Sequence, residues 1–380
     1  MGIALFILGL LLFIGLILIH EWGHFIMARR NGVEVEEFGL GFPPRAKILK
    51  KLNGTIYSLN WLPLGGFVKL KGEHDIDTEP GTFGNATTKA KIKIMMAGVV
   101  MNLLTAFVLF TIVALIGMPK LLDNQSTIAS DTSTQNIIRD EGLIKVGRVV
   151  ESSPAAQAGI SEDDEIVSIA GIEITKVEDV SLATETNAGK KVVVELRRDN
   201  QLITKEVTLN SESPYLGIGP YDATINIEVR RSTWSAPIVA AAVMKDFTIA
   251  TFKGLGSALS GLGSTIAGIV TGNQAARQAG QTEASEQVSG PIGIFSALYN
   301  ISKLGLGLVL FIIGLISLTL AIMNALPIPA LDGGRLFVTL VFRALRKPLR
   351  PEIEERIHGT GFVVLMMLFV LITIVDIRRL

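Results

Sequence analysis

The sequence has no cysteine among its 380 residues, so it can form neither disulfides nor thiolate metal sites. It carries 35 basic and 35 acidic residues, and this balance gives no global field that would attract nucleic acid. It has only four histidines. Any metal site must therefore use histidine and carboxylate ligands, and few histidines are available to contribute.

Long apolar runs dominate the sequence. Its mean hydropathy is +0.47 and 49% of its residues are hydrophobic, which predicts a membrane protein with room for one soluble module. The first run, residues 2–19, has no charge, and apolar residues continue to Arg29 and Arg30. It lacks a basic segment before it and a cleavage-site pattern after it. We therefore interpret it as a retained membrane helix and not as a signal peptide.

The motif His20-Glu21-x-x-His24 lies near the end of this run. At about 1.5 Å per residue, His20 is roughly 27 Å along the helix, toward the far side of a hydrocarbon core about 30 Å thick. Ionisable side chains at such depth usually mark function. His20 and His24 stand one helical turn apart and can bind one metal ion, while Glu21 is placed to take a proton from water at the metal. Zn²⁺ suits such ligands. The alternative is a chance arrangement of packed polar residues.

Charge patterns predict the topology. Residues 29–93 hold eleven Lys or Arg against seven acids, which favours the cytoplasmic side.

Asn53-Gly54 predicts a hairpin turn between residues 45–52 and 55–61, and a second turn at 63–66 leads into 67–71. This hairpin is either a small soluble sheet with an apolar face or a re-entrant element that dips into the bilayer and lines a cavity.

The fold class that we predict is a polytopic α-helical membrane protein with four transmembrane helices, a membrane-associated β-hairpin and an extracytoplasmic α+β domain. Asn102 is the one strongly polar residue of the second helix, where bonding to a neighbouring helix is the commoner role. The expected segments are a first membrane helix (1–30), a cytoplasmic loop with the re-entrant hairpin (31–93), a second membrane helix (94–119), a linker (120–139), the α+β domain (140–220), interfacial amphipathic helices and a linker (221–303), a third membrane helix (304–334), a cytoplasmic loop (335–356) and a fourth membrane helix (357–377).

Two histidines need a third ligand, and Asp332 is the strongest candidate. Pro327 and Pro329 break the helix before it, which is tolerated where the freed backbone faces protein or a watery cavity. Asp332 then reaches the depth of the two histidines. Asn324, about two turns above, is placed to donate to a substrate backbone or an oxyanion. The alternative for Asp332 is a turn residue at a helix C-terminus ahead of Gly-Gly. The other candidate ligands are Glu73, His74, Asp75, Asp77 and His358.

Three motifs together resemble the site-2 protease family, and most closely the bacterial regulators of sigma-E protease. They are His20-Glu21-x-x-His24, residues 63–69 (PLGGFVK) and residues 324–334 (NALPIPALDGG). The resemblance implies that His20, His24 and Asp332 bind Zn²⁺, that Glu21 is the general base and that Asn324 contacts substrate. It also implies that the hairpin pairs with substrate around Pro63, Leu64, Gly65, Gly66 and Phe67, and that residues 290–293 lead into the third span.

Residues 140–220 resemble one PDZ domain, with residues 215–219 (YLGIG) like its carboxylate-loop strand in a circularly permuted form. Such a groove adds a peptide C-terminus as an extra strand. The alternative is a steric spacer that binds nothing. The chain departs from the family at Val99, where proline is usual, and this departure concerns helix shape more than chemistry.

The function that we expect is intramembrane zinc-dependent cleavage of single-pass transmembrane substrates, such as anti-sigma factors or signal-peptide remnants, after their outer domains have been removed. The protein would lie among the lipids of a bacterial inner membrane, with its active site near the cytoplasmic side, and would not bind nucleic acid. Two alternatives are a non-catalytic membrane scaffold with a PDZ-like domain and a membrane-tethered zinc peptidase that acts on soluble peptides.

Overall fold

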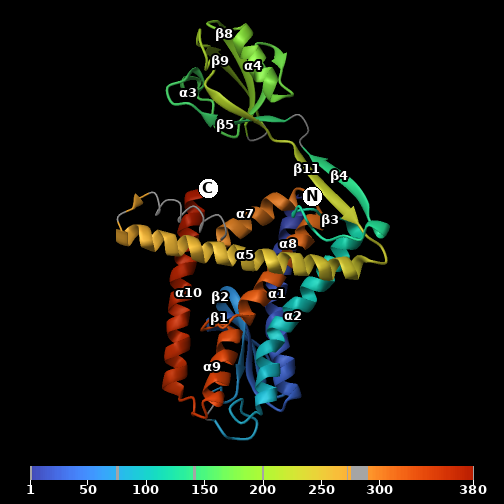
Figure 1. Ribbon diagram of the computed structural model, residues 1–380, viewed down its shortest axis with the longest axis vertical. Helices are drawn as coiled ribbons and strands as arrows, with labels where there is room; N and C mark the ends of the chain where they lie inside the picture. Colours follow the sequence, from blue (N-terminus) through green and yellow to red (C-terminus); the bar gives the residue numbers. More distant parts are fainter. Residues whose placement is uncertain are drawn as a thin grey trace. The chain divides into compact units, whose positions relative to one another are not determined.

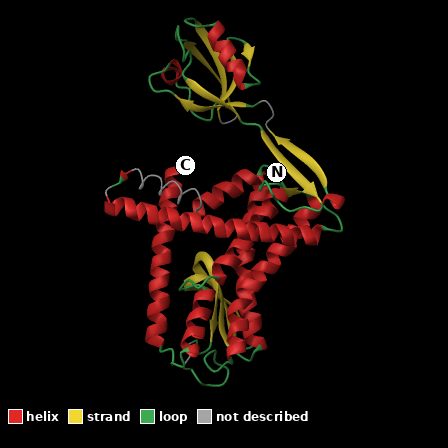
Figure 2. Cartoon of the chain, viewed as in Figure 1, coloured by secondary structure: helices red, strands yellow, loops and turns green. Residues whose placement is uncertain are grey.

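The computed structural model describes residues 2–73, 77–139, 143–198, 201–271, 273–274 and 290–379. The chain forms two compact units, the first from residues 1–133 and 230–380 and the second from residues 134–229. Helices predominate in the first unit and strands in the second (Figure 2). The helices of the first unit are α1 (Gly2–Arg30), α2 (Thr88–Ile116), α5 (Ala236–Thr271), α7 (Pro291–Ser302), α8 (Leu306–Ala325), α9 (Asp332–Ala344) and α10 (Pro351–Arg379).

Four helices in the described part of the chain are long and apolar enough to cross a membrane. They are α1, α2, α8 and the Pro351–Ile374 part of α10. This agrees with the four spans expected from the sequence. The stretch expected to hold interfacial helices and a linker (221–303) contains, among its described residues, α5, a helix of 36 residues, and the shorter α7. The place of α5 at the membrane surface stays a prediction, and most of the linker that follows it lies outside the described residues.

The predicted hairpin is present as β1 (Val35–Leu52) and β2 (Thr55–Leu70), two antiparallel strands beside α1 (Figure 1). Leu52 pairs with Thr55, so the chain turns at Asn53-Gly54, as the sequence predicts. Phe38 pairs with both Tyr57 and Val68. The segment 37–40 therefore lies between the segments 56–59 and 66–69, and the second expected turn folds the chain back. Among the described strands, residues 66–69 form an outer edge of this sheet.

An ion pair between an exposed arginine and a buried glutamate holds the first segment of β1 to its neighbour. Glu37 is 7% exposed and accepts hydrogen bonds from Arg45 and from the Ser58 hydroxyl. The hydrogen bond from Arg45 and the one from Ser58 lower the pKa of Glu37, in spite of its burial. The carboxylate thus stays ionised and paired inside the hairpin.

The helix break before Asp332 is present, and it differs from the helix end considered as the alternative. α8 ends at Ala325, Ala330 takes a left-handed conformation with φ of 78°, and Asp332 is the first residue of α9. A Cβ at Gly333 or Gly334 would overlap backbone atoms of residues 325–329. The two glycines therefore let the new helix start against the loop, and the interpretation of Asp332 as a C-terminal turn residue is wrong. The stretch expected as a loop over 335–356 is accordingly helical to Ala344 and again from Pro351.

An aromatic cluster packs α2, α5 and α8 together. The ring of Phe311 lies 5.4 Å from Phe110 and 5.5 Å from Phe247, measured between centroids. All three side chains are buried. Such pairs are worth about 0.5–1.5 kcal/mol beyond the area they bury, so they fix α2 and α8, which carry polar residues at the site.

The second unit is the α+β module expected from the strand pattern. Its sheet has the order β10-β5-β6-β8-β9, with β7 paired to β6, and β4 pairs with β11. A short helix, α3, spans Pro154–Ala158. Buried Ile, Val and Leu side chains form its core. Its PDZ-like identity stays a prediction. The remaining elements are β3 (Met118–Pro119), the 3-10 turn Ala129–Asp131, β4 (Ser133–Arg139), β5 (Ile144–Val149), α3 (Pro154–Ala158), β6 (Glu165–Ile169), β7 (Ile172–Glu173), α4 (Val177–Thr186), β8 (Lys191–Arg198), β9 (Gln201–Thr208), β10 (Ile218–Asp222) and β11 (Ile225–Arg231).

Candidate metal centre

Three predicted ligands converge from two distant parts of the chain. The Nε2 atoms of His20 and His24 lie 3.1 and 3.2 Å from Oδ2 of Asp332. The two Nε2 atoms are 3.2 Å from each other. His20 and His24 stand on α1 and Asp332 begins α9, so folding joins residues more than 300 positions apart. Among the described residues, these three form a group able to hold a metal ion.

The triangle of ligand atoms fits a tetrahedral zinc ion. Bonds of about 2.0–2.1 Å at tetrahedral angles place neighbouring ligand atoms about 3.3 Å apart, close to the observed separations. In the described part of the chain, Oδ2 of Asp332 is buried and has no hydrogen bond that satisfies it. A buried carboxylate oxygen without a donor is costly unless a cation meets it. The donor set of two imidazoles and one carboxylate also suits zinc and leaves a fourth position for water or substrate.

Helix α2 orients both imidazoles. Nδ1 of His24 donates to the Ile94 carbonyl over 2.8 Å, and this leaves Nε2 free to bind metal. Nδ1 of His20 lies 3.2 Å from the side-chain amide of Asn102. Between them, Gly98 faces both rings, and a Cβ there would lie 2.5 Å from atoms of each histidine. Ile94, Gly98 and Asn102 are spaced by four residues and so share one face of the helix.

Glu21 lies between the ligands and the outer edge of the hairpin. Its carboxylate lies close to His20, His24 and Asp332 and to the Val68 backbone. A Cβ on Gly66 would lie 3.1 Å from Cγ of Glu21. The glycine therefore lets β2 approach the carboxylate closely. Within β2 lie the expected substrate-binding residues Pro63, Leu64, Gly65, Gly66 and Phe67.

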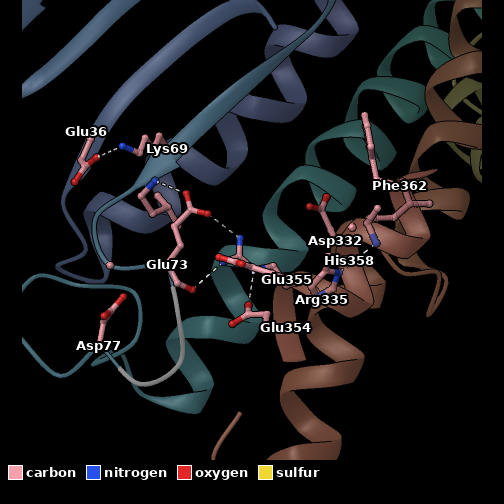
Figure 3. A pocket seen from close by; sticks show the side chains of 15 residues that line it. Glu36, Lys69, Glu73, Asp77, Asp332, Arg335, Glu354, Glu355, His358 and Phe362 are labelled. Atoms are coloured by element: carbon pink, nitrogen blue, oxygen red, sulfur yellow. Dashed lines mark hydrogen bonds and ion pairs between the residues drawn. The ribbon is translucent and has the colours of Figure 1, made fainter. Parts of the chain in front are cut away.

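A pocket of about 780 Å³ opens on the Asp332 side of the site. Figure 3 shows Asp332, Arg335 and His358 on one wall and Glu73 on the other, with Arg335 bonded to Glu73. The walls come from α9 and α10 on one side and from the end of β2 on the other. Charged side chains therefore line the pocket that leads to Asp332, the third predicted ligand.

Helix α10 supports the loop that carries Asp332. The Ala330 backbone N–H donates to Nδ1 of His358 over 3.2 Å. A Cβ on Gly361 would lie 2.5 Å from Cβ of Pro329, so glycine permits this contact. His358 thus touches the loop before the ligand and is not itself in the triangle.

The other candidate residues have different places. Glu73 pairs with Arg335, and Asp77 lines the pocket. Neither belongs to the ligand group that the structure shows. His74 and Asp75 lie outside the described residues. Asn324 is partly exposed in the last turn of α8.

Apolar spans around two histidines, a carboxylate and an adjacent glutamate define a membrane metallopeptidase. The model of Peptidase family M50 matches residues 8–368, and the chain belongs to this family, the site-2 proteases. A protein of Clostridium perfringens (strain 13 / Type A) named as a zinc metalloprotease is 32% identical, over 98% of each chain. Zinc metalloprotease RasP of Bacillus licheniformis is 25% identical, over 98% of each chain.

A third relative is the Regulator of sigma-W protease RasP of Bacillus subtilis (strain 168). It is 25% identical over 98% of this chain and 97% of its own length. The resemblance drawn from the motifs is thus confirmed at the level of the family. The expected cofactor is confirmed as well, because the relatives from Clostridium perfringens and Bacillus licheniformis are zinc metalloproteases by name and the family uses Zn²⁺.

Three residues at the site could not be assigned from the sequence. Asn102 was expected to bond a neighbouring helix, and it does reach α1, but its partner there is a predicted metal ligand. Gly98 gave no signal that related it to the metal, and His358 was considered only as a ligand, whereas it accepts the Ala330 N–H in the loop before Asp332. The one available clue was the four-residue spacing of Ile94, Gly98 and Asn102. It places the Ile94 carbonyl, the space left by Gly98 and the Asn102 amide on a single face of the helix.

Proposed function

We propose that this protein is an intramembrane zinc endopeptidase that cleaves single-pass transmembrane proteins, with Zn²⁺ held by His20, His24 and Asp332. The observation that carries the proposal is the convergence of these three ligand atoms, within 4.8 Å of one another, near the end of an apolar helix whose residues 2–19 carry no charge. A site for soluble peptides has no need of such surroundings. Polar groups at this depth are costly and are retained where they act.

Zn²⁺ held by His20, His24 and Asp332 would supply a Lewis acid able to polarise the scissile carbonyl and to lower the pKa of bound water. Glu21 takes a proton from the attacking water and passes it to the leaving amine. Its place beside both histidines and Asp332 gives it the necessary reach. Asn324 is assigned to contact the substrate backbone, on the strength of the family motif.

The outer edge of β2 is the surface that we assign to the unwound substrate. Residues 66–69 are an outer segment of the sheet, and Gly66 lies against Glu21. A substrate helix hides its carbonyls in its own hydrogen bonds, and pairing with this edge offsets the bonds it loses on unwinding.

Regulated proteolysis after removal of the outer domain is the role that fits these features. One similar protein bears the name Regulator of sigma-W protease RasP, which supports anti-sigma factors as a substrate class. The basic residues of the 29–93 and 335–356 loops favour a cytoplasmic active site in a bacterial inner membrane. The second unit would then lie outside, as a PDZ-like domain that binds a peptide C-terminus or excludes intact substrates.

The test is co-expression with single-pass proteins truncated outside the membrane. Glu21→Gln should abolish cleavage while zinc stays near one per chain, because the amide cannot accept the proton but leaves the ligands in place. Glu151→Gln, at an exposed position of the second unit, is the matched control and should cleave normally. Cleavage that persists in Glu21→Gln would refute the assigned role.

A membrane-tethered peptidase for soluble peptides is the remaining enzymatic alternative. Purified protein given an unfolded soluble protein and a membrane-embedded peptide side by side separates the two. Our proposal requires cleavage of the embedded peptide. Cleavage of the soluble protein alone would favour the alternative, and failure to cleave either with zinc bound would favour a scaffold.

A further inference from the structure

The hydrogen bond between Asn102 and His20 has a direction that decides whether His20 can bind metal. Asn102 is 1% exposed in α2, and its amide nitrogen as placed lies 3.2 Å from Nδ1 of His20. A neutral imidazole whose Nδ1 accepts a hydrogen bond must carry its hydrogen on Nε2. Nε2 of His20 is the atom that faces His24 and Asp332. In this orientation the ligand atom would be protonated and blocked.

The second histidine has the opposite arrangement. Nδ1 of His24 meets a carbonyl oxygen, which can only accept, so Nδ1 carries the hydrogen and Nε2 keeps its lone pair. Both histidines face the ligand triangle with Nε2, so both need the tautomer that carries its hydrogen on Nδ1. His20 therefore requires an acceptor at Nδ1, and the side-chain oxygen of Asn102 is the group that can provide it.

The amide is able to turn. Oxygen and nitrogen of an asparagine amide have nearly the same shape, and their placement is assigned from the hydrogen-bond network. The Oδ1 of Asn102 is buried and has no hydrogen-bond partner among the described residues. Rotating the Asn102 amide by half a turn therefore breaks no hydrogen bond of Oδ1, and it lets Oδ1 accept a hydrogen bond from the Nδ1–H of His20.

The backbone around Asn102 is held in place independently. The Ser317 hydroxyl of α8 donates to the Asn102 carbonyl over 2.9 Å, and both residues are buried. The gap at Gly98, one turn earlier, lets the His20 ring lie close to α2. The backbone position of Asn102 is therefore fixed. The main freedom that remains to its side chain is rotation of the amide, which decides whether the oxygen or the nitrogen faces His20.

We propose that Asn102 is a positioning residue for the zinc site: its side-chain oxygen accepts the Nδ1–H of His20 and so fixes the tautomer that leaves Nε2 free for Zn²⁺. The inference rests on the proposed function only in that His20 is a zinc ligand. Partners of metal-bound histidines typically change metal affinity about 10–100-fold when they are removed.

Two substitutions distinguish an acceptor from a donor. Asn102→Asp provides oxygens that can only accept, whereas Asn102→Leu provides nothing. Thr105→Val is the matched control, because Thr105 is one turn further along α2 and bonds the Met101 carbonyl of its own helix. The measurements are zinc retained by purified full-length protein against a chelator, and the visible absorption of the Co²⁺-substituted protein, which reports ligand geometry.

The expected result is zinc retention within about threefold of wild type for Asn102→Asp and Thr105→Val, and a loss of about 10–100-fold for Asn102→Leu with an altered Co²⁺ spectrum. Wild-type retention in Asn102→Leu overturns the inference, as does an Asn102→Asp protein that loses as much zinc as Asn102→Leu. Should Asn102→Leu fail to fold, Asn102→Asp decides alone: retained zinc supports the inference and lost zinc overturns it. Wild type and His20→Ala are measured in parallel, because failure of wild type to hold zinc, or full retention by His20→Ala, rejects the zinc site itself.

Discussion

Substituting Gly98 with alanine tests the fit between α2 and the two histidines. The added Cβ would lie 2.5 Å from Cε1 of His20 and 2.5 Å from Nε2 of His24. Carbon atoms in good contact are about 3.5–4.0 Å apart, so the rings or the helix must retreat by about 1 Å. Both neighbours are imidazole rings of predicted metal ligands, so neither ring can shift without moving the Nε2 atom that would bind Zn²⁺.

That displacement is large for a metal site. Metal–ligand distances tolerate about 0.2 Å, roughly a fifth of the movement that the methyl group requires. Overpacking of this kind also lowers the free energy of unfolding by about 1–3 kcal/mol. We therefore expect Gly98→Ala to weaken zinc binding by at least about 10-fold, the lower end for changes around metal-bound histidines.

The assay is zinc content of purified protein after graded chelator competition, with thermal unfolding in detergent as a check of folding. Gly15→Ala is the matched control, because Gly15 lies in α1 with no atom within 4 Å of an added Cβ among the described residues. It should keep its zinc, and its stability should not fall, since alanine is the better helix residue. Folded Gly98→Ala protein with the zinc affinity of wild type would refute the reasoning.

Two further predictions concern α10. His358→Leu removes the acceptor of the Ala330 N–H and should weaken zinc retention and substrate cleavage together, whereas His358→Asn keeps an acceptor and should lose less; equal retention in both variants would contradict a role for this bond. Asp376 is 4% exposed and accepts from the backbone N–H groups of Gly290 and Gly293 at the start of α7. Asp376→Ala should therefore lower the free energy of unfolding by about 0.5–2 kcal/mol in detergent, and an unchanged unfolding midpoint would count against that cap.

Local sequence rules were sufficient for the elements. The uncharged run of helical length predicts α1, the Asn-Gly pair predicts the β1–β2 turn, and the two prolines near Asp332 predict the α8–α9 break. The structure has each of these elements where the pattern places it. The third ligand was accessible for the same reason, because the prolines allow a polar residue at helix depth.

The contacts between helices were not accessible in this way. Whether Asn102 meets lipid, another helix or a metal ligand depends on the rotation of α2 about its axis, which aromatic packing far along the helix fixes. The start of a helix at Asp332 depends on the close fit of Gly333 and Gly334 against the preceding loop, and a Gly-Gly pair by itself is as typical of a helix end.

The most direct test of the account is the zinc content of full-length wild type, Asp332→Ala and Asp77→Ala, purified side by side and treated with the same chelator. Asp77 lines the neighbouring pocket and was a rival candidate ligand, so it serves as the control. We predict about one zinc per chain in wild type and Asp77→Ala, and almost none in Asp332→Ala, because two histidines alone do not complete the site. Zinc held equally well by Asp332→Ala, or lost from Asp77→Ala instead, would contradict the account.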